Sequence, residues 1–452
     1  MKKLLTIVLS VLLLLPVAAC ADTGRRGSSE NLTFLHIWPE HSATISSIIN
    51  DFMSENPDIV VDIIESSYSD VDRTLQSVYG TPEMPDVFFY WTHQMSKWVV
   101  DDVAMDISDV VAEVKSDLVS EGVPVEVGKI GGKYYNMPFR ATGFVVVYNK
   151  TMLDSLGKSV PTCMEDFEQL VKDLKNTPVN GNNVVPLAAY NADDGTIHQL
   201  NSAFSTFVSI QKGAVEDVNY RTGRLASTED DYRLAAKCVM KNKAWLDAGY
   251  FGSYTSRESV QQDFIQGRAA MAILNNNDFG ILKEQMEGVE IGVFGIPAPK
   301  ALPGVKFVYG GFDGFAINNY TEKEEQAKRL LKYLVSEEVQ EKFANAEQGI
   351  VVNKNVTYDN ADTAAIALEM VDVGKYDSQP DYNSGSYGQL NSDLLASTFA
   401  KPNVSLAQWI EIEKQFTANI TKALADRQLN PVEVGWIEPT YTRKTFDEAW
   451  LG

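Results

Sequence analysis

The chain has 452 residues, of which 61 are acidic and 39 are lysine or arginine, giving a formal net charge of −22. A surface this acidic repels nucleic acid and anionic lipid headgroups, so we expect neither as a partner. Aromatic residues make up 10% of the chain. This excludes a mainly disordered protein, because disordered chains have few large apolar side chains.

The chain contains only three cysteines and four histidines. No C-x-x-C pair or other Cys/His spacing typical of zinc ligands occurs, so we expect no metal and no cofactor. Cys163 and Cys238 lie in the middle of the chain. We favour two buried free thiols, and a disulfide between them is the alternative.

The start of the chain has the composition of an export signal. Lys2 and Lys3 precede an apolar run over 4–17 that is too short for a comfortable transmembrane helix. The two alanines before Cys20 resemble the lipobox of bacterial lipoproteins. That resemblance implies removal of residues 1–19 and attachment of acyl chains to Cys20, whereas the alternative is an ordinary signal peptide. We therefore expect a protein on the extracellular face of the cell membrane, held there by its lipid alone.

The mature chain is expected to have a short tether and a large globular part. Residues 20–31 are mostly small and polar, which predicts a flexible tether. The remainder, 32–452, exceeds the size that a single hydrophobic core usually supports. We therefore expect two lobes, in a protein that acts as a monomer.

Strands and helices alternate at the start of the globular part. Ile45, Ile48 and Phe52 recur at helical spacing, whereas 59–64 is a mainly β-branched run typical of a buried parallel strand. The expected elements are a strand at 32–38, a helix at 45–53, a strand at 59–64, a helix at 71–79 and a strand at 86–91. This alternation predicts an α/β layer with a mostly parallel sheet.

A second alternating unit begins after residue 140. Thr162 and Glu165 have the spacing of a capping box, which predicts a helix through Leu174. Further strands are expected at 144–148, 184–190, 269–274, 291–296 and 312–317. Further helices are expected at 196–207, 229–246, 325–335, 338–346, 363–371 and 406–425. The sequence thus predicts an α/β protein made of two alternating halves.

Several local patterns, in this order, are similar to those of one protein family. They are NDFMSENPDIVV at 50–61, PDVFFYW at 85–91, GKYYNMP at 132–138 with YNK at 148–150, PT at 161–162 with Glu165 and Phe167, GRAAM at 267–271, and FAI at 315–317 before the helix at 325–333. Their order and spacing extend over nearly the whole mature chain. The chain therefore resembles the family-1 extracellular solute-binding proteins of ABC importers, the group that contains the maltose-binding protein.

This resemblance implies a periplasmic-binding-protein-like fold, with two α/β lobes joined by a three-segment hinge. It places lobe one at 32–140 plus 276–318 and lobe two at 141–275 plus 319–452. The first, second and third crossings between lobes would lie at the motifs at 132–150, 267–271 and 315–317. The resemblance also implies a non-enzymatic receptor whose partners are a small-molecule ligand, held between the lobes, and the transmembrane subunits of a permease.

Residues suited to a sugar follow two strands of the expected first lobe. A sugar site needs flat aromatic surfaces and convergent hydrogen-bonding groups. Trp38 and Glu40 follow the first strand, and Tyr90, Trp91 and His93 end or follow the third. The resemblance puts Tyr90 where the maltose-binding member has a stacking ring. It puts His93 where that member has an acidic acceptor, a departure that argues against maltose itself. Trp38 and Trp91 are equally typical of core residues that cap their strands.

Three more candidates lie at the expected crossings. The guanidinium of Arg140 can bind paired hydroxyls or a carboxylate, and a structural ion pair is the alternative of equal weight. Phe312 and Asp313 stand between glycines, where backbone can approach a ligand closely. We therefore assign all three to ligand binding.

Four further polar or aromatic candidates end or follow strands of the second alternating unit. Tyr190 and Asn191 end the strand at 184–190, and Asn276 and Asp278 lie in an amide-rich run after the strand at 269–274. Amides suit hydroxyl ligands, although runs of asparagine also form ordinary turns.

A lipid-anchored receptor that delivers a carbohydrate, in particular an oligosaccharide, to a permease is therefore the leading functional hypothesis. An extracellular glycoside hydrolase is one alternative, because a pair of catalytic carboxylates is easily hidden among so many acids. A sugar-sensing surface protein on the same scaffold is another.

Overall fold

The structure is a computed structural model, and it describes residues 30–67, 70–91, 98–99, 101–118, 129–178, 181, 183–190, 200, 203–205, 207–208, 218–219, 224–254, 256–347, 349–371, 375–376, 394–395, 397–401, 403–426 and 449–451. The expected signal, Cys20, His93, Asn191 and most of the helix expected at 196–207 lie outside these residues. For Tyr90, Trp91, Tyr190 and Phe312, the backbone is described and the side chain is not. Within the described ranges, no helix is both long and apolar enough to cross a membrane.

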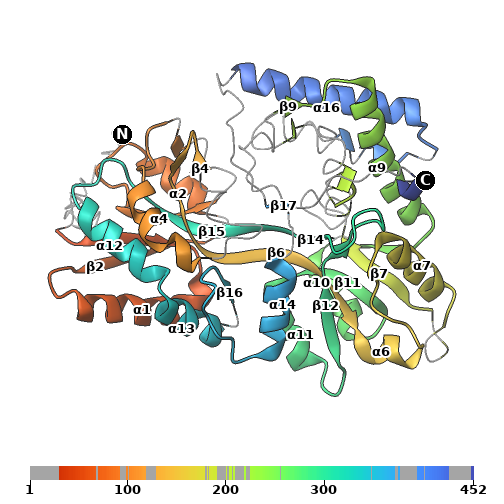
Figure 1. Cartoon of the computed structure of the whole chain (residues 1–452), viewed down its shortest axis with the longest axis horizontal. Coiled ribbons are helices and arrows are strands. Elements are labelled where there is room, and N and C mark those ends of the chain that lie inside the picture. The colour runs from red at the N-terminus through yellow and green to blue at the C-terminus, as the bar shows by residue number, and fades with distance from the viewer. Residues whose placement is uncertain are drawn as a thin grey trace, which may run out of the picture.

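The first lobe has the predicted alternation of strands and helices (Figure 1). Its first strands and helices are β1 (Leu32–His36), α1 (Ser42–Glu55), β2 (Val61–Glu65), α2 (Val71–Val78) and β3 (Val87–Trp91). Strand β1 pairs in parallel with both β2 and β3. Helix α1 buries the predicted stripe of Ile45, Ile48, Ile49 and Phe52. It ends at Glu55, just before Asn56-Pro57, because proline cannot continue a helix.

The rest of the first lobe consists of short elements and two returning helices. The short elements are η1 (Pro39–His41), α4 (Ser108–Val114), η3 (Lys115–Asp117) and the hairpin of β4 (Lys129–Ile130) and β5 (Lys133–Tyr134). The returning helices are α12 (Glu324–Leu334) and α13 (Glu337–Glu347). Helix α12 packs on α4, with Lys328 Nζ 2.7 Å from Asp109 Oδ2, and α13 packs on α1, with Lys342 Nζ 2.8 Å from Ser47 Oγ.

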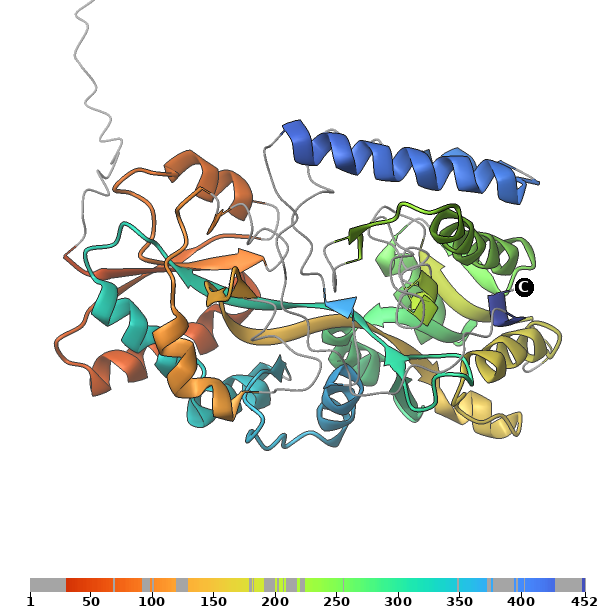
Figure 2. The ribbon, with the colours of Figure 1, turned by 45° about the horizontal axis from the view of Figure 1, so that its top comes forward.

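Two long strands connect the first lobe to the second. Strand β6 (Met137–Asn149) pairs antiparallel with β15 (Tyr309–Ile317), and both run between the lobes in Figures 1 and 2. The chain crosses a third time near β16 (Ile350–Val351), which pairs with β6. The register places Asp313 of β15 and Val351 of β16 both opposite Arg140. The three connections between the lobes therefore lie side by side at Arg140.

The second lobe continues the same sheet. Its strands are β7 (Val185–Tyr190), β10 (Phe251–Tyr254), β11 (Ala269–Asn275) and β12 (Ile291–Phe294). Strands β10, β7 and β11 are mutually parallel, and β11 and β12 are each antiparallel to β6. The sheet order is β10-β7-β11-β6-β15-β3-β1-β2. The fold is thus α/β with parallel strands in each lobe and antiparallel pairing where the chain crosses, which confirms the predicted class.

Helices cover the second lobe, and two small pairs of strands, the short strand β17 and two short turns complete it. The helices are α6 (Lys150–Ser155), α7 (Met164–Lys175), α9 (Glu229–Asp247), α10 (Arg257–Ile265), α11 (Phe279–Gln285), α14 (Ala361–Val371) and α16 (Leu406–Asp426). The short elements are β8 (Val218–Asn219), β9 (Arg224–Leu225), η4 (Asn276–Asp278), β13 (Ile296–Pro297), β14 (Lys306–Phe307), β17 (Lys375–Tyr376) and η5 (Ala449–Leu451). Helix α16 lies along α9 on the outside of this lobe (Figure 2).

The lobe boundaries differ from the predicted ones. Residues 276–308 were expected in lobe one. However, β12 pairs with the C-terminal end of β6, and Ile296 and Phe307 are buried among hydrophobic residues of the second lobe. Conversely, α12 and α13 were expected in lobe two and pack on the first lobe. The reason is that β11 lies between β7 and β6 and does not cross. The second crossing is β15, and the third follows α13.

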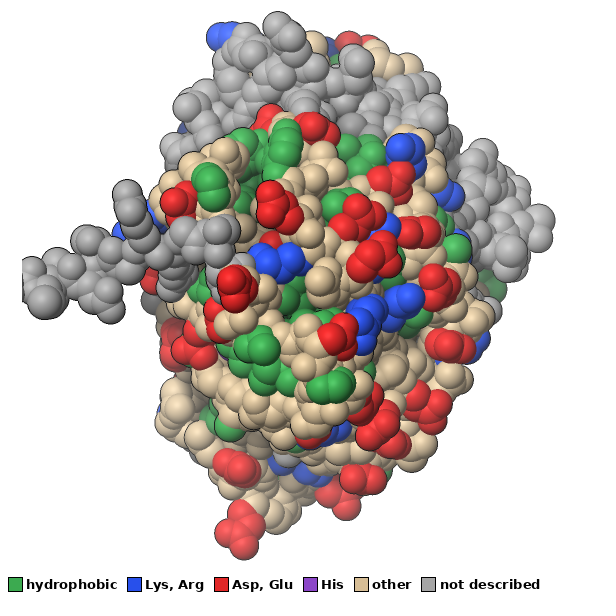
Figure 3. Space-filling view, turned by 90° about the vertical axis from the view of Figure 1, so that its left-hand side faces the viewer, with side chains coloured by type: hydrophobic (Ala, Val, Ile, Leu, Met, Phe, Trp, Pro, Cys, Tyr) green, Lys and Arg blue, Asp and Glu red, His purple; other side chains and the backbone are tan. Residues whose placement is uncertain are grey.

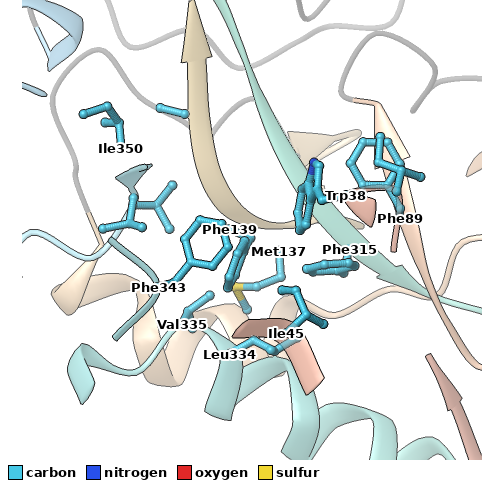
Figure 4. Packing of buried hydrophobic residues seen from close by; sticks show 14 of the residues in the cluster. Trp38, Ile45, Phe89, Met137, Phe139, Phe315, Leu334, Val335, Phe343 and Ile350 are labelled. Carbon is cyan, nitrogen blue, oxygen red and sulfur yellow. The ribbon is translucent and has the colours of Figure 1, made fainter. Parts of the chain in front are cut away.

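Buried aromatic residues gather in both lobes. In the first, Trp38 packs among Phe89, Phe139, Phe315 and Phe343, as Figure 4 shows. In the second, the buried aromatic residues include Phe167, Phe204, Phe207, Trp245 and, from the C-terminal end of the chain, Trp450. Trp245 and Trp409 are both buried. Cys163 and Cys238 are buried free thiols, which confirms the favoured alternative.

The end of the molecule formed by the first lobe carries charges of both signs. Acidic side chains lie beside lysine and arginine across this face rather than in one block (Figure 3). Lys328 lies 2.6 Å from Glu324 as well as bonding Asp109, and Lys332 pairs with Glu113. Ion pairs at a protein surface add little stability, but mixed charge keeps a surface soluble.

The helix predicted to begin with a capping box at Thr162 and Glu165 begins without one. Helix α7 begins after Cys163 with no side-chain cap, and Glu165 instead accepts a hydrogen bond from the Lys300 N–H at 3.0 Å. A complete capping box occurs at α9. There Thr228 Oγ1 accepts from the Asp231 N–H at 3.1 Å, and the Asp231 carboxylate accepts from the Thr228 N–H at 3.0 Å.

The two caps give a matched test of helix capping in this fold. Thr228→Ala is expected to lower the free energy of unfolding by about 1 kcal/mol, because it removes a helix N-cap. Thr162→Ala removes only an exposed contact to Asp166 and is expected to cost less than about 0.5 kcal/mol. Urea unfolding followed by circular dichroism compares the two, and equal losses would contradict the assignment of the caps.

Candidate functional site

The carboxyl ends of the strands in both lobes point to the same middle segment of the sheet (Figures 1 and 2). From the first lobe, β3 ends with Trp91 opposite Asp313 of β15. From the second, β11 ends with Asn275 opposite Phe144 of β6. Strands β1 and β2 run in the same direction as β3, and strands β7 and β10 run in the same direction as β11. Open α/β sheets bind ligands beyond the carboxyl ends of their strands, so this edge is the candidate site.

Arg140 and Asp313 form a buried ion pair at the centre of this edge. The Arg140 Nε lies 2.9 Å from Asp313 Oδ2, and each residue is 2% exposed. The Arg140 guanidinium carbon also lies 4.4 Å from the centre of the Trp38 ring, within the range of a cation–π interaction. Both charged residues were predicted to bind ligand. In this structure they bind each other, which corresponds to the ion-pair alternative for Arg140.

Trp38 lies in the core beneath this pair. Its exposed fraction is 0%, and ring centres of Phe139, Phe89 and Phe315 lie 5.6–5.7 Å away. Its backbone N–H donates to His36 Nδ1 at 3.2 Å, which fixes the turn of the chain after β1. The structure therefore places Trp38 as the core alternative describes.

Glu40, in contrast to the buried Trp38, is exposed to solvent. It lies in the first turn of η1, directly beyond the carboxyl end of β1, and its side chain is 51% exposed. Its Oε1 is 3.8 Å from His41 Nε2. A half-exposed carboxylate in this position can accept hydrogen bonds from paired hydroxyls.

The predicted amide run joins the second lobe to the crossing strand. Asn276 Oδ1 accepts from the Gly143 N–H at 2.9 Å, and Asn275 Nδ2 donates to Thr142 Oγ1 at 3.1 Å. Asn276 is 5% exposed and Asp278 4% exposed. In this structure, the side chains of Asn276 and Asp278 therefore hold the loop after β11 in place.

Four predicted aromatic residues are placed by backbone register. Tyr90 and Trp91 lie opposite Gly314 and Asp313 of β15, and Phe312 lies opposite Ala141 of β6. Tyr190 lies opposite Tyr254 at the carboxyl end of β10. The structure brings these backbones to the candidate edge, and their contact with a ligand stays a prediction. His93 and Asn191, on the segments that follow Trp91 and Tyr190, lie outside the described residues.

One charged residue at this edge was missed by the sequence patterns. Arg257 is the first residue of α10 and follows β10, a strand that no pattern predicted because FGSY is short and carries two small residues. Its Nε donates to Asp278 Oδ2 at 2.9 Å, and its side chain is 40% exposed. Among the described residues, no group of three His, Cys, Asp or Glu side chains is arranged to hold a metal.

The chain belongs to the bacterial extracellular solute-binding protein family, whose profile matches residues 38–341. It is 24% identical to the Multiple sugar-binding protein of Streptococcus mutans over 364 residues, covering 76% of this chain and 80% of the relative. The structure of the sugar-binding protein MalE of Xanthomonas citri matches with a TM-score of 0.72 at 16% identity, covering 88% of this chain and 99% of MalE. UgpB of Mycobacterium tuberculosis, solved in complex with glycerophosphocholine, matches with a TM-score of 0.67 at 18% identity, covering 89% and 100%.

These comparisons confirm the family and the periplasmic-binding-protein-like fold predicted from the motifs. The two structural likenesses show the shared fold. The proteins named above are a sugar-binding relative, a sugar-binding structure and a structure in complex with glycerophosphocholine.

Breaking the buried pair is expected to be costly. Asp313→Ala leaves the Arg140 guanidinium buried without its carboxylate and is expected to lower the free energy of unfolding by about 3–5 kcal/mol. Lys332→Ala removes an exposed pair with Glu113, whose side chains are 36% and 61% exposed, and is expected to cost less than about 1 kcal/mol. Chemical denaturation measures both, and similar losses would contradict a structural role for the buried pair.

Stability is also expected to depend on the protonation of His36. Burial, with a smaller contribution from the charge of His41, lowers the pKa of His36 to about 4. As pH falls below about 6.5 the unfolded chain binds a proton that the folded chain rejects, so stability is lost between about pH 6.5 and 4. The loss attributable to this group is about 3 kcal/mol.

The measurement compares urea unfolding of the wild type and His36→Asn at pH 7 and pH 4.5. Asparagine keeps an acceptor for the Trp38 N–H and cannot take up the proton. The variant is expected to lose less stability on acidification than the wild type. The same pH dependence in both would contradict the neutral, buried His36.

Proposed function

We propose that the protein is a lipid-anchored extracellular receptor of an ABC importer, which captures a carbohydrate between its two lobes and delivers it to a permease. The observation that carries this proposal is the convergence of strand ends from both lobes on one crossing segment. Family membership and the sugar-binding name of the Streptococcus mutans relative support it.

The proposed mechanism is closure of the lobes around the ligand. The three connections lie side by side at Arg140, so small backbone changes beside this point would swing one lobe relative to the other. A ligand that contacts both edges stabilises the closed form, because it binds that form more tightly than the open one. The closed surface would then be recognised by the permease.

The proposed binding groups suit a hydroxylated ligand. Glu40 offers a half-exposed acceptor on the first lobe. The rings of Tyr90, Trp91, Tyr190 and Phe312, with the polar groups of His93 and Asn191, are proposed to supply stacking and further hydrogen bonds. Arg140, Asp313, Asn276 and Asp278 are proposed to act by holding the crossing in shape, since their bonds are within the protein.

We also infer that the mature protein begins at Cys20 and is held on the outer face of the cell membrane by acyl chains on that residue. The apolar run ahead of Cys20 and the two alanines before it support this anchor. Two acyl chains give stable attachment without a membrane-spanning segment. Binding without catalysis is proposed because the family is one of solute-binding proteins.

The proposal is tested by thermal-shift and calorimetric titration with two neutral trisaccharides, maltotriose and raffinose, and with glycerophosphocholine. A ligand at one hundred times its dissociation constant stabilises the folded state by about 2.7 kcal/mol, so binding of a trisaccharide should raise the melting temperature clearly. Mannitol at equal concentration controls for nonspecific stabilisation.

Other outcomes separate the alternatives. Stabilisation by glycerophosphocholine alone, or by no compound, would contradict a carbohydrate receptor. Release of reducing ends from a bound oligosaccharide during incubation would favour a hydrolase instead.

A further inference from the structure

Arg257 is a half-exposed cation at the carboxyl edge of the second lobe. Strand β10 ends at Tyr254, whose register partner is Tyr190 at the end of β7, and α10 begins three residues later with Arg257. Arg257 therefore lies at the same edge as the predicted ligand residues of β7 and β11.

A buried carboxylate holds this arginine in place. Arg257 Nε donates to Asp278 Oδ2 at 2.9 Å, and Arg257 Nη2 donates to Asp278 Oδ1. Asp278 is 4% exposed and also accepts from the Asn275 N–H at 3.1 Å, which ties the carboxylate to the loop after β11. Two parallel hydrogen bonds fix the plane of a guanidinium, so this side chain is oriented before any ligand binds.

The anchored side chain still has donors to offer. A guanidinium carries five N–H donors, and the bonds to Asp278 use two of them. Within the described part of the chain, Asp278 is the partner to which Arg257 is bonded, and 40% of the arginine side chain is exposed. The remaining donors are available for a molecule at this edge.

Two other arginine–aspartate pairs show what is particular about this one. The Arg140–Asp313 pair is buried, with each residue 2% exposed. The Arg268–Asp263 pair has an exposed arginine, but Arg268 precedes β11 and lies at the opposite, amino edge of the same strands. The Arg257 side chain, by contrast, is exposed, its guanidinium plane is fixed, and it lies at the candidate edge.

We propose that Arg257 contacts the ligand and determines its charge class, with Asp278 as a positioning residue. This assignment rests on the proposed receptor function. The paired charges of Arg257 and Asp278 cancel, so the site offers directed N–H donors without net positive charge. Hydroxyl oxygens of a neutral carbohydrate can accept hydrogen bonds from such donors. An anionic group, in contrast, would be repelled by the nearby carboxylate of Asp278.

The first test removes both charges together, because Arg257→Gln alone would leave Asp278 buried without its partner. The variant Arg257→Gln/Asp278→Asn is titrated with maltotriose and raffinose by calorimetry. Loss of charge-assisted hydrogen bonds is expected to weaken binding of the preferred trisaccharide roughly 10- to 100-fold. The matched control, Arg268→Gln/Asp263→Asn, changes the same residue types at the far edge and should bind as the wild type does.

The second test uses charge selectivity, which a purely structural role would not change. Asp278→Asn leaves the Arg257 charge uncompensated, so binding of glucose 6-phosphate relative to the neutral trisaccharide should rise at low salt. This gain should disappear in the Arg257→Gln/Asp278→Asn variant.

The outcomes are distinguishable. Unchanged trisaccharide affinity in the double variant, with binding by the wild type intact, overturns the assignment of Arg257 alone. Failure of the wild type to bind either trisaccharide counts against both this assignment and the receptor function.

Discussion

One buried ion pair, between Arg140 and Asp313, lies where the three connections between the lobes meet. Buried pairs of this kind add little net stability, because desolvation offsets much of the attraction, but removing one partner is costly. The pair therefore acts as a constraint on geometry. It fixes the register of β6 against β15, and the stacked ring of Trp38 couples that register to the end of β1. The strand ends that form the candidate site take their positions from this constraint.

Polar residues at the site fall into two groups by exposure. Arg140, Asp313 and Asn276 are buried and bonded to other parts of the protein, so they shape the crossing. Glu40 and Arg257 are exposed and lie on opposite lobes, beyond the ends of β1 and β10. An acceptor on one lobe and a donor on the other suit a ligand whose hydroxyls act as both donor and acceptor. A ligand that bridges the two lobes would favour their closure.

The sequence predicted strand and helix positions well where periodicity was strong. The α1 stripe and the apolar runs of β3 and β11 matched, since buried faces leave a clear pattern, whereas β6 begins at Met137, ahead of the strand predicted at 144–148. The lobe boundaries did not, because pairing of β11 with β6 is a long-range contact that no local pattern shows.

For a related reason, the sequence could name candidate site residues but not their environments. Residue type and position after a strand indicated the carboxyl edge of the sheet, but could not tell exposed groups from buried ones. Trp38 and Arg140 carry chemistry suited to a sugar, and their burial follows only from the packing of Phe139 and Phe315 around them. Arg257 was missed because the strand before it is short.

The central claim, closure of two lobes about the Arg140 crossing, is tested most directly by an interlobe distance. Val60 on the first lobe and Val160 on the second are exposed, and the native thiols of Cys163 and Cys238 are buried, so cysteines introduced at the two valines can be spin-labelled selectively. Double electron–electron resonance on the chain that starts after the signal, with Cys20→Ser, gives the distance distribution with and without a bound trisaccharide. The account predicts a narrower distribution at a changed distance when the sugar is bound. An identical distribution in both states, at sugar concentrations that saturate binding, would contradict it.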